Sequence, residues 1–303
     1  MRVIEETQPR VANCAWCGSS LDGSALRLRG RTQCPACGAA TTDPWPSEEQ
    51  LRQAYGSWYR PESGRFALIG DPLLRRTRAL LAGRLDRIAP PGSVLDVGAG
   101  EAVLIDALRR RGREAVGLER DSRRQDMRDD PLERVEGEWA AVVFWHSLEH
   151  LPEPGGAIRE AARLLRPGGM VVIAVPNTDS LQAQAFGDRW LHLDPPLHLV
   201  HLSERALRSR LTACGFEVER VSHVRGGQIV IGWLDGLVGM LPGRLRLYQA
   251  LRRPEARSGA LSAGRRAAAL AAGVLLLPLA MGGAAIEVVL RRSGTVYMEA
   301  RLA

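Results

Sequence analysis

The clearest pattern of apolar and polar positions lies between residues 94 and 120. Two short apolar runs, 94–97 and 115–118, flank a stretch in which Val103 and Leu104 begin an apolar series at helical spacing. This pattern predicts a strand, a turn, an amphipathic helix and a second strand. Such a βαβ unit binds nucleotide-like ligands at its first turn.

The alternation of strand and helix continues after this unit. Residues 141–145 and 170–175 are apolar runs typical of buried strands, and residues 154–166 between them predict a helix that ends at a Pro-Gly-Gly sequence. The alternation predicts an α/β protein with a parallel, doubly wound sheet. Residues 120–138 are almost entirely polar, so we expect a third strand and its helix to be shortened or lost.

Glycines and an acid near the first turn indicate the kind of ligand. Gly98 and Gly100 let the backbone approach a bound molecule closely, and Glu119, at the end of the second strand, can accept hydrogen bonds from a ribose diol. The spacing between Asp96 and Glu119 suits that arrangement. The pattern therefore favours a nucleoside-type ligand.

Four cysteines near the N-terminus have metal-binding spacing. Cys14 and Cys17 form one C-x2-C pair, Cys34 and Cys37 form another, and a glycine that suits a tight turn follows each pair. Such pairs can present four thiolates tetrahedrally to Zn²⁺. We expect zinc to staple a small ribbon that could not otherwise hold a core, and a ribbon that docks on a partner or on nucleic acid is the alternative.

A linker and a helical segment separate the ribbon from the βαβ unit. Ser47 has N-cap character, and residues 72–88 predict a helix. Between them, Tyr55, Trp58 and Tyr59 can either fold over the ligand as a lid or pack the ribbon onto the main domain.

Composition and charge narrow the class of protein. An apolar content of 45% in 303 residues allows a sizeable core and excludes a disordered chain. All 41 basic residues are arginine, and residues 220–303 carry twelve of them against four acidic residues. That charge favours an anionic partner, either a membrane surface or nucleic acid. The first ten residues lack an apolar core, so we expect no signal peptide and a cytoplasmic protein.

An apolar insertion of about seventy residues precedes the last predicted strand, 295–302. Within it, residues 228–241 are apolar, and residues 267–286 carry no charge and are flanked by arginine pairs. Length alone permits a membrane span, but the chain must return to the sheet. We expect a re-entrant or interfacial helical hairpin at an anionic membrane surface, peripheral at its inner face. The alternative is a helical cap that forms a dimer interface or closes over the substrate.

Motifs between residues 90 and 225 add a family signal to this fold. They are L-D-V-G-A-G at 95–100, the acid at 119, H-S-L-E-H-L at 146–151, R-L-L-R-P-G-G at 163–169, V-P-N at 175–177, F-G-D-R-W-L-H-L-D-P-P-L-H-L-V-H-L-S at 186–203 and C-G-F at 214–216. Together they resemble class I S-adenosylmethionine-dependent methyltransferases, in particular the ubiquinone-type and cell-envelope-associated small-molecule branch.

The resemblance implies a fold and a set of cofactor residues. It implies a seven-stranded Rossmann-like sheet with the cofactor at the carboxyl ends of its strands, and residues 217–224 and 295–302 as the last two strands, with the last one antiparallel. The residues expected at the cofactor are Asp96, Gly98, Ala99, Gly100, Glu119, Arg120 and Trp145. Ala102 replaces the third glycine of the usual motif, and Asp126 or Asp129 is expected on the adenine side.

Methyl transfer requires a group that removes a proton from the acceptor. His146, Glu149 and His150 follow the strand at 141–145, and their i, i+3, i+4 spacing predicts one helical face. Three interpretations stay open: a general base with its carboxylate, a divalent-metal site such as related quinone O-methyltransferases use, and a structural cap.

A second polar segment is expected to line the acceptor pocket, with ordinary packing as the alternative. Its residues are Trp190, His192, Asp194 and His198. The Asp-Pro-Pro sequence at 194–196 resembles a motif of amino-methylating nucleic-acid enzymes. In those enzymes the motif follows the fourth strand, a place that residues 144–147 occupy here.

The predicted organisation is a zinc ribbon (1–42), a linker and helical lid (43–89), a methyltransferase core (90–225), the apolar insertion (226–293) and the last strand (294–303). We expect methylation, of an oxygen in particular, of a small or lipid-linked acceptor of envelope-glycan or quinone type, with nucleic acid disfavoured. The alternatives are an rRNA or tRNA methyltransferase that reads through its ribbon, and a binding protein that has lost catalysis.

Overall fold

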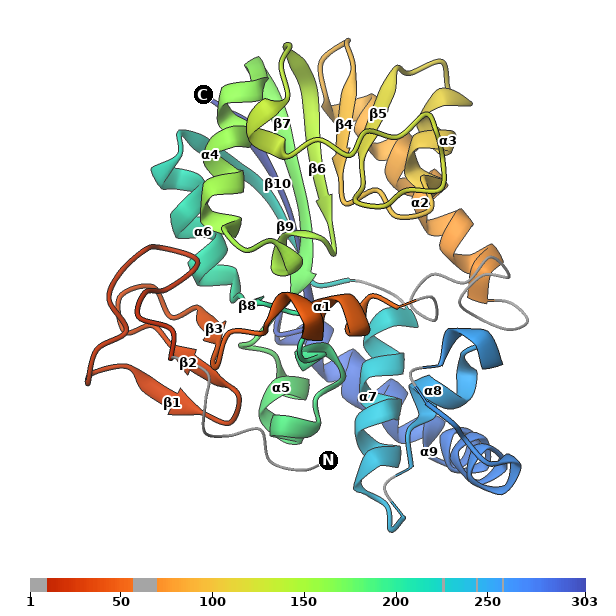
Figure 1. Ribbon diagram of the computed structural model, residues 1–303. Coiled ribbons are helices and arrows are strands. Elements are labelled where there is room, and N and C mark those ends of the chain that lie inside the picture. Colours follow the sequence, from red (N-terminus) through yellow and green to blue (C-terminus); the bar gives the residue numbers. More distant parts are fainter. Residues whose placement is uncertain (1–9, 57–69, 225–226, 244, 258) are drawn as a thin grey trace.

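The computed structural model describes residues 10–56, 70–224, 227–243, 245–257 and 259–303. It contains a six-stranded sheet covered by helices on both faces, a smaller four-stranded sheet beside one end of it, and a group of apolar helices at that same end (Figure 1). Trp58 and Tyr59, expected in a lid, lie outside the described residues.

The main sheet has the order β5-β4-β6-β7-β10-β9. Its strands are β4 (Val94–Val97), β5 (Ala115–Leu118), β6 (Trp139–Trp145), β7 (Leu165–Pro176), β9 (Phe216–Ser222) and β10 (Thr295–Leu302). The first four in the sheet order are parallel, and β10 is antiparallel to both β7 and β9. This confirms the predicted α/β, Rossmann-like fold with an antiparallel last strand.

Helices on the two faces of the sheet build two cores. On one face lie α2 (Gly70–Ile88) and α3 (Val103–Arg109), and on the other lie α4 (Pro154–Leu164) and α6 (Glu204–Ala213). Alternate residues of β6 serve the two cores: Val143 packs with α2 and α3, whereas Phe144 packs with α4. Both sheet faces are therefore buried, which explains the continuous apolar runs of β6 and β7.

The region after β5 departs from the seven-stranded sheet that the resemblance implies. Residues 120–138 contain a single parallel bridge, between Leu118 and Arg128, and one short 3-10 turn, η1 (Leu132–Arg134). The seventh strand is thus reduced to one bridging residue, because the polar segment offers no apolar run that a sheet edge could bury.

The smaller sheet joins two distant parts of the chain. Its strands are β1 (Leu26–Leu28), β2 (Arg31–Gln33), β3 (Ala40–Thr42) and β8 (Val200–His201), in that order and antiparallel. The first three come from the cysteine ribbon, and β8 comes from the segment after α5 (Leu181–Phe186). Helix α1 (Glu48–Ala54) follows the ribbon and begins at Ser47, which forms a capping box with Gln50.

The insertion between β9 and β10 is helical. It consists of α7 (Gly227–Met240), α8 (Leu247–Leu251), the short turn η5 (Pro254–Ala256) and α9 (Ala263–Val289). Apolar residues of α7, α8 and α9 form a core of their own. Within the described parts of the chain, α9 is the one helix long and apolar enough, by length and composition alone, to cross a membrane.

Candidate active site

The turn between β4 and α3 has the geometry of a ligand-binding loop. Gly98 and Gly100 have φ of +77° and +60°, and Ala102, which replaces the third glycine, has φ of +58°. A Cβ atom at Gly98 would lie 2.4 Å from Ser147 Cβ, so the turn approaches the segment after β6 more closely than any side chain allows. Only glycine suits this position.

Two acids line the turn. Glu119, directly after β5, accepts a hydrogen bond from the Gly100 amide (2.6 Å), which ties the end of β5 to the turn. Asp96 is buried, and its Oδ1 atom has no hydrogen-bond partner among the described residues. Burial raises the pKa of Asp96 to about 7, although the Arg78 charge opposes the shift. The glycine path and the adjoining acid fit a nucleoside such as that of S-adenosylmethionine.

Three more residues are expected at the cofactor. Ala99 lies within the turn, and its amide donates to Leu118 O (3.0 Å) at the end of β5. Arg120 follows Glu119 and is exposed, next to Asp121 in the left-handed region (φ +52°). Trp145 ends β6 and is half-buried, with the Arg78 guanidinium 4.5 Å from its ring centroid.

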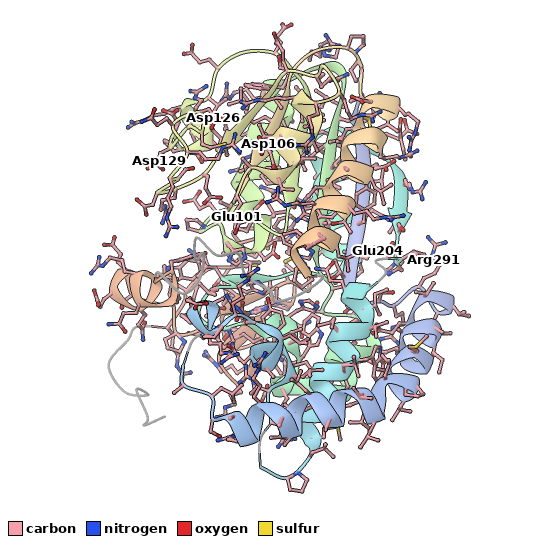
Figure 2. The ribbon with its side chains drawn as sticks, turned by 90° about the vertical axis from the view of Figure 1, so that its right-hand side faces the viewer. Glu101, Asp106, Asp126, Asp129, Glu204 and Arg291 are labelled. Atoms are coloured by element: carbon pink, nitrogen blue, oxygen red, sulfur yellow. The ribbon has the colours of Figure 1, made fainter. Side chains whose placement is uncertain are left out.

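The segment after β5 contains the two acids expected on the adenine side, Asp126 and Asp129. Asp126 is held by Arg109 and Arg124, whose guanidiniums keep the pKa of its carboxyl below the usual range. This arrangement engages Asp126 with α3 and leaves Asp129, exposed at the same edge, as the remaining adenine-side candidate (Figure 2). Met127 is buried instead and packs on Gly117, where a Cβ would lie 2.1 Å from Met127 Cε.

A buried carboxylate forms the centre of a second group of polar side chains, His146, Glu149, His150 and His198, which we call the acid–histidine cluster. Glu149 lies in the 3-10 turn η2 (Leu148–His150) and is 1% exposed. Its Oε1 atom is 3.3 Å from His146 Nδ1 and 4.0 Å from His198 Nε2, and its Oε2 atom has no hydrogen-bond partner within the described chain. Burial raises the pKa of Glu149 to about 7. A carboxyl group with such a pKa can exchange protons near neutral pH.

The predicted helical face is wrong in its geometry. His146 precedes η2 with φ of +54°, so no α-helix includes all three side chains. His146 reaches Glu149, whereas His150 faces His198, with ring centroids 4.7 Å apart and nearly perpendicular. Ligand atoms of Glu149, His150 and His198 all lie within 4.8 Å of one another, so the set that could hold a cation contains His198 instead of His146.

Backbone carbonyls define the tautomers of two histidines. His150 Nδ1 is 2.9 Å from Leu197 O, and His198 Nδ1 is 2.8 Å from His192 O. A carbonyl can only accept, so each Nδ1 carries the proton and each Nε2 is the basic nitrogen. Both histidines therefore present Nε2 for proton transfer or for ligation.

Comparison with known proteins identifies the domain that contains both the glycine turn and the acid–histidine cluster. Residues 71–221 match the family model described as "Methyltransferase domain". Curated relatives include ubiquinone biosynthesis O-methyltransferases. The one from Pseudomonas paraeruginosa is 30% identical over 118 residues, which cover 33% of this chain and 47% of that protein. The one from Xanthomonas oryzae is 30% identical over 154 residues, which cover 41% and 64%. The chain thus spans about half to two thirds of the length of these relatives.

These matches decide the identity of the domain. Residues 71–221 form a class I S-adenosylmethionine-dependent methyltransferase domain.

Solved structures with a similar arrangement include the cyclase SpnF and a SAM-dependent methyltransferase from Archaeoglobus fulgidus. The first has a TM-score of 0.44 and 19% identity and covers 85% of this chain and 96% of its own. The second has a TM-score of 0.43 and 16% identity and covers 77% and 99%.

The ribbon contacts the methyltransferase domain at the acid–histidine cluster. Strand β3 pairs with β8, the Thr42 amide donates to Leu199 O (2.9 Å), and the Thr42 hydroxyl donates to His198 O (2.7 Å). Trp16 is buried and donates through its indole to Ala206 O (3.2 Å). The ribbon therefore helps to fix the backbone of His198.

The four cysteines lie where the sequence predicts a metal site. The Sγ atoms of Cys14 and Cys37 are 3.7 Å apart, and those of Cys17 and Cys34 are 3.6 Å apart. Four thiolates at about 2.3 Å from a tetrahedral Zn²⁺ are about 3.8 Å apart, so the cluster fits this ion.

The residues predicted to line the acceptor pocket have different surroundings: one is packed in a hydrophobic cluster, and the others lie beside His198. Trp190 is buried and packs in a cluster with Phe186. Asp194 is exposed in a left-handed turn (φ +34°) whose carbonyl accepts from the His198 amide (3.2 Å). His192 supplies the carbonyl that holds His198, and burial lowers the pKa of His192 to about 3. His192 is therefore neutral at physiological pH.

Sequence reasoning missed two polar contacts of the site. Gln228 Nε2, in the first turn of α7, is 3.0 Å from His146 Nε2. Tyr55, at the end of α1, brings its hydroxyl to 3.1 Å from His150 Nδ1 and so contacts the main domain at this cluster. The available signal for Gln228 was weak: one amide at the start of an apolar segment.

Proposed function

We propose that this chain transfers a methyl group from S-adenosylmethionine to an oxygen of a small or lipid-linked acceptor of quinone or envelope-glycan type. One observation carries the proposal: the cofactor turn contacts Ser147, which lies within the segment 146–150 that holds His146, Glu149 and His150. Ser147 packs on Gly98, and Glu149 follows two residues later. The segment that carries the proposed base, His150, thus packs on the turn where the methyl donor would bind.

The roles follow from the geometry. Glu119 and the glycine turn would hold the nucleoside of S-adenosylmethionine. When bound, this cofactor would supply an electrophilic methyl group: the acceptor oxygen would form the new bond to carbon as the carbon–sulfur bond breaks and its electrons stay on sulfur. His150 accepts the acceptor's proton at Nε2, since its Nδ1 proton is committed to Leu197 O. Glu149 orients His146, which Gln228 contacts from the other side.

A metal-assisted reaction is the second candidate, because Glu149, His150 and His198 are grouped closely enough to bind one divalent cation. In that case His150 is a ligand and not a base. The O-methyl specificity draws support from the names of the curated relatives.

Calorimetry with S-adenosylmethionine on the full chain is the first test. Binding in the micromolar range supports the enzyme, and absence of binding at high micromolar concentration overturns it in favour of a non-catalytic binding protein. Release of S-adenosylhomocysteine is then measured with ortho-dihydroxy aromatic acceptors, with and without an isoprenyl tail.

His150→Ala separates base from metal ligand. As a base, His150 is required for turnover but not for cofactor binding, added imidazole restores part of the rate, and chelators have no effect. As a ligand, the loss is reproduced in the unmodified chain by a chelator and is reversed by a divalent cation. Loss of cofactor affinity in the variant contradicts both roles.

A further inference from the structure

Helix α9 distributes its side chains in the opposite way from a helix on the surface of a water-soluble protein. Its buried apolar positions carry small residues, namely Ala269, Gly273, Ala280 and Ala284. Large apolar side chains face outward: Val274 is 73% exposed, Leu275 79%, Leu279 60%, Met281 56% and Val289 80%. In water, burial of the large side chains would be the favourable choice.

The small residues are explained by what they contact. A Cβ at Gly283 would lie 2.7 Å from the Trp233 ring of α7, and a Cβ at Gly273 would lie 3.0 Å from Leu247 of α8. Large side chains of α7 and α8 thus fill the inner side of α9. The outward face, which we define as Val274, Leu275, Leu279, Met281, Ile286 and Val289, has no cover in the described structure. Such a face indicates an interaction site.

The charges at the two ends of α9 indicate the kind of partner that this face would bind. Arg265 and Arg266 stand at the start of α9, and Arg291 and Arg292 follow its end. The only acid between these pairs, Glu287, is buried and accepts hydrogen bonds from Gln182. An apolar band with a cationic group at each end and no exposed acid matches a bilayer with anionic headgroups.

A second copy of the chain matches this face poorly. In a symmetric antiparallel pair of α9 helices, the Arg265 end of one helix meets the Arg291 end of the other, and no exposed acid of α9 offsets the repulsion. An anionic surface neutralises both ends at once.

The length of α9 and its connections to the rest of the chain favour an orientation along a lipid surface instead of across it. A 27-residue helix is about 40 Å long, more than the roughly 30 Å of the hydrocarbon core. Helix α7 packs along it, and six residues after Val289 the chain has returned to the sheet at Thr295, the start of β10. Figure 2 shows α9 extended along the lower border of the molecule, with Arg291 at the end nearest the sheet.

We infer that the outward face of α9 docks this protein in the plane of an anionic lipid surface. The inference is independent of methyl transfer, because it needs neither cofactor nor acceptor. The same surface lies one helix from the site, since α7 contacts α9 and carries Gln228 to His146.

Co-sedimentation of the full chain with vesicles tests the inference. We expect binding to vesicles of phosphatidylcholine mixed with phosphatidylglycerol, and at least about tenfold weaker binding to phosphatidylcholine alone or in high salt. Leu275→Glu should abolish binding. The matched control is Leu80→Glu on α2, a leucine that is 66% exposed and should leave vesicle binding unchanged. Arg265→Gln with Arg291→Gln should weaken binding without touching the apolar face.

Circular dichroism and S-adenosylmethionine affinity verify that each variant is folded, and the arginine variant keeps the test valid if Leu275→Glu does not fold. Equal sedimentation of the Leu275 and Leu80 variants overturns the inference. So does a dimer seen by ultracentrifugation that Leu275→Glu abolishes, since the face would then belong to a second copy. Retention on vesicles after an alkaline carbonate wash would show a spanning helix and contradict docking in the plane.

Discussion

The two halves of the candidate site are built in different ways. The cofactor half is local: β4, its glycine turn, α3 and β5 follow one another, and Glu119 reaches Gly100 over 19 residues. The acceptor half is assembled from distant segments, since His150 meets Tyr55 over 95 residues, and the His198 backbone is held by Thr42 over 156. The cofactor half is thus held largely by contacts between neighbouring segments, whereas the acceptor half also depends on the ribbon.

Disruption of the ribbon should show the largest difference between the two halves, because it should damage the acceptor half and spare the cofactor half. In Cys34→Ser the four-cysteine cluster is incomplete, so we expect β3 to support β8 less well and the His198 backbone to lose its anchor. We expect the melting temperature to fall by about 10 °C and turnover to be lost, with cofactor affinity changed by no more than about threefold. Metal content, thermal melting and calorimetry measure this. Cys214→Ser, outside the cluster, is the matched control. An equal loss of cofactor affinity would show that the halves are not separable.

Gly98→Ala should have the reverse effect. The new Cβ combines an unfavourable φ of +77° with a 2.4 Å approach to Ser147. We expect cofactor affinity to fall about 100-fold, roughly 3 kcal/mol. Gly168→Ala is the control, because Gly168 has a similar φ of +72° but no atom within 4 Å of the added Cβ. Similar losses in both variants would assign the effect to backbone strain and not to the contact.

Each half contains one buried acid with a raised pKa, Asp96 and Glu149, both at about 7. Each stabilises the fold fully below its unfolded-state pKa, near 4, and loses that contribution as pH rises toward 7. Asp96→Asn and Glu149→Gln should therefore be more stable than the parent at pH 8, by about 4 and about 3 kcal/mol respectively, and equal to it near pH 4. Denaturant unfolding of the cofactor-free chain across this pH range measures the effect. A constant difference with pH would contradict the raised pKa values.

Thr42→Val is the mildest way to weaken the acceptor half. It removes the hydroxyl that donates to His198 O and should cost about 1 kcal/mol of stability, with a several-fold loss of turnover and unchanged cofactor affinity. Thr77→Val removes a hydroxyl that donates to Leu74 O on the exposed side of α2 and is the matched control. Identical kinetics of the two variants would show that the ribbon does not position His198.

The cofactor half could be predicted from the sequence to a greater extent than the acceptor half. Strands, helices and the glycine turn of the cofactor half are recognisable because their signals, period and spacing, are local. The cysteine cluster is recognisable for the same reason. The helical face at 146–150 was wrong because His146 takes a left-handed conformation that ends β6 abruptly, which residue spacing does not reveal.

The contacts of Gln228 and Thr42 could not be predicted, because they join segments 82 and 156 residues apart and depend on how the insertion and the ribbon pack. The outward face of α9 was only partly predictable. Its composition indicated a membrane helix, but the burial of its small residues and exposure of its large ones required the packed structure.

Strand β8 has a consequence for synthesis. The ribbon leaves the ribosome with β3 as an open sheet edge, and its partner, which places His201 near Thr42, is made 159 residues later. Until then β3 presents unpaired backbone groups that another chain could pair with. The ribbon is thus complete only after most of the main sheet has been synthesised. A nascent chain whose four cysteines have already come together still awaits β8, the strand that completes the small sheet.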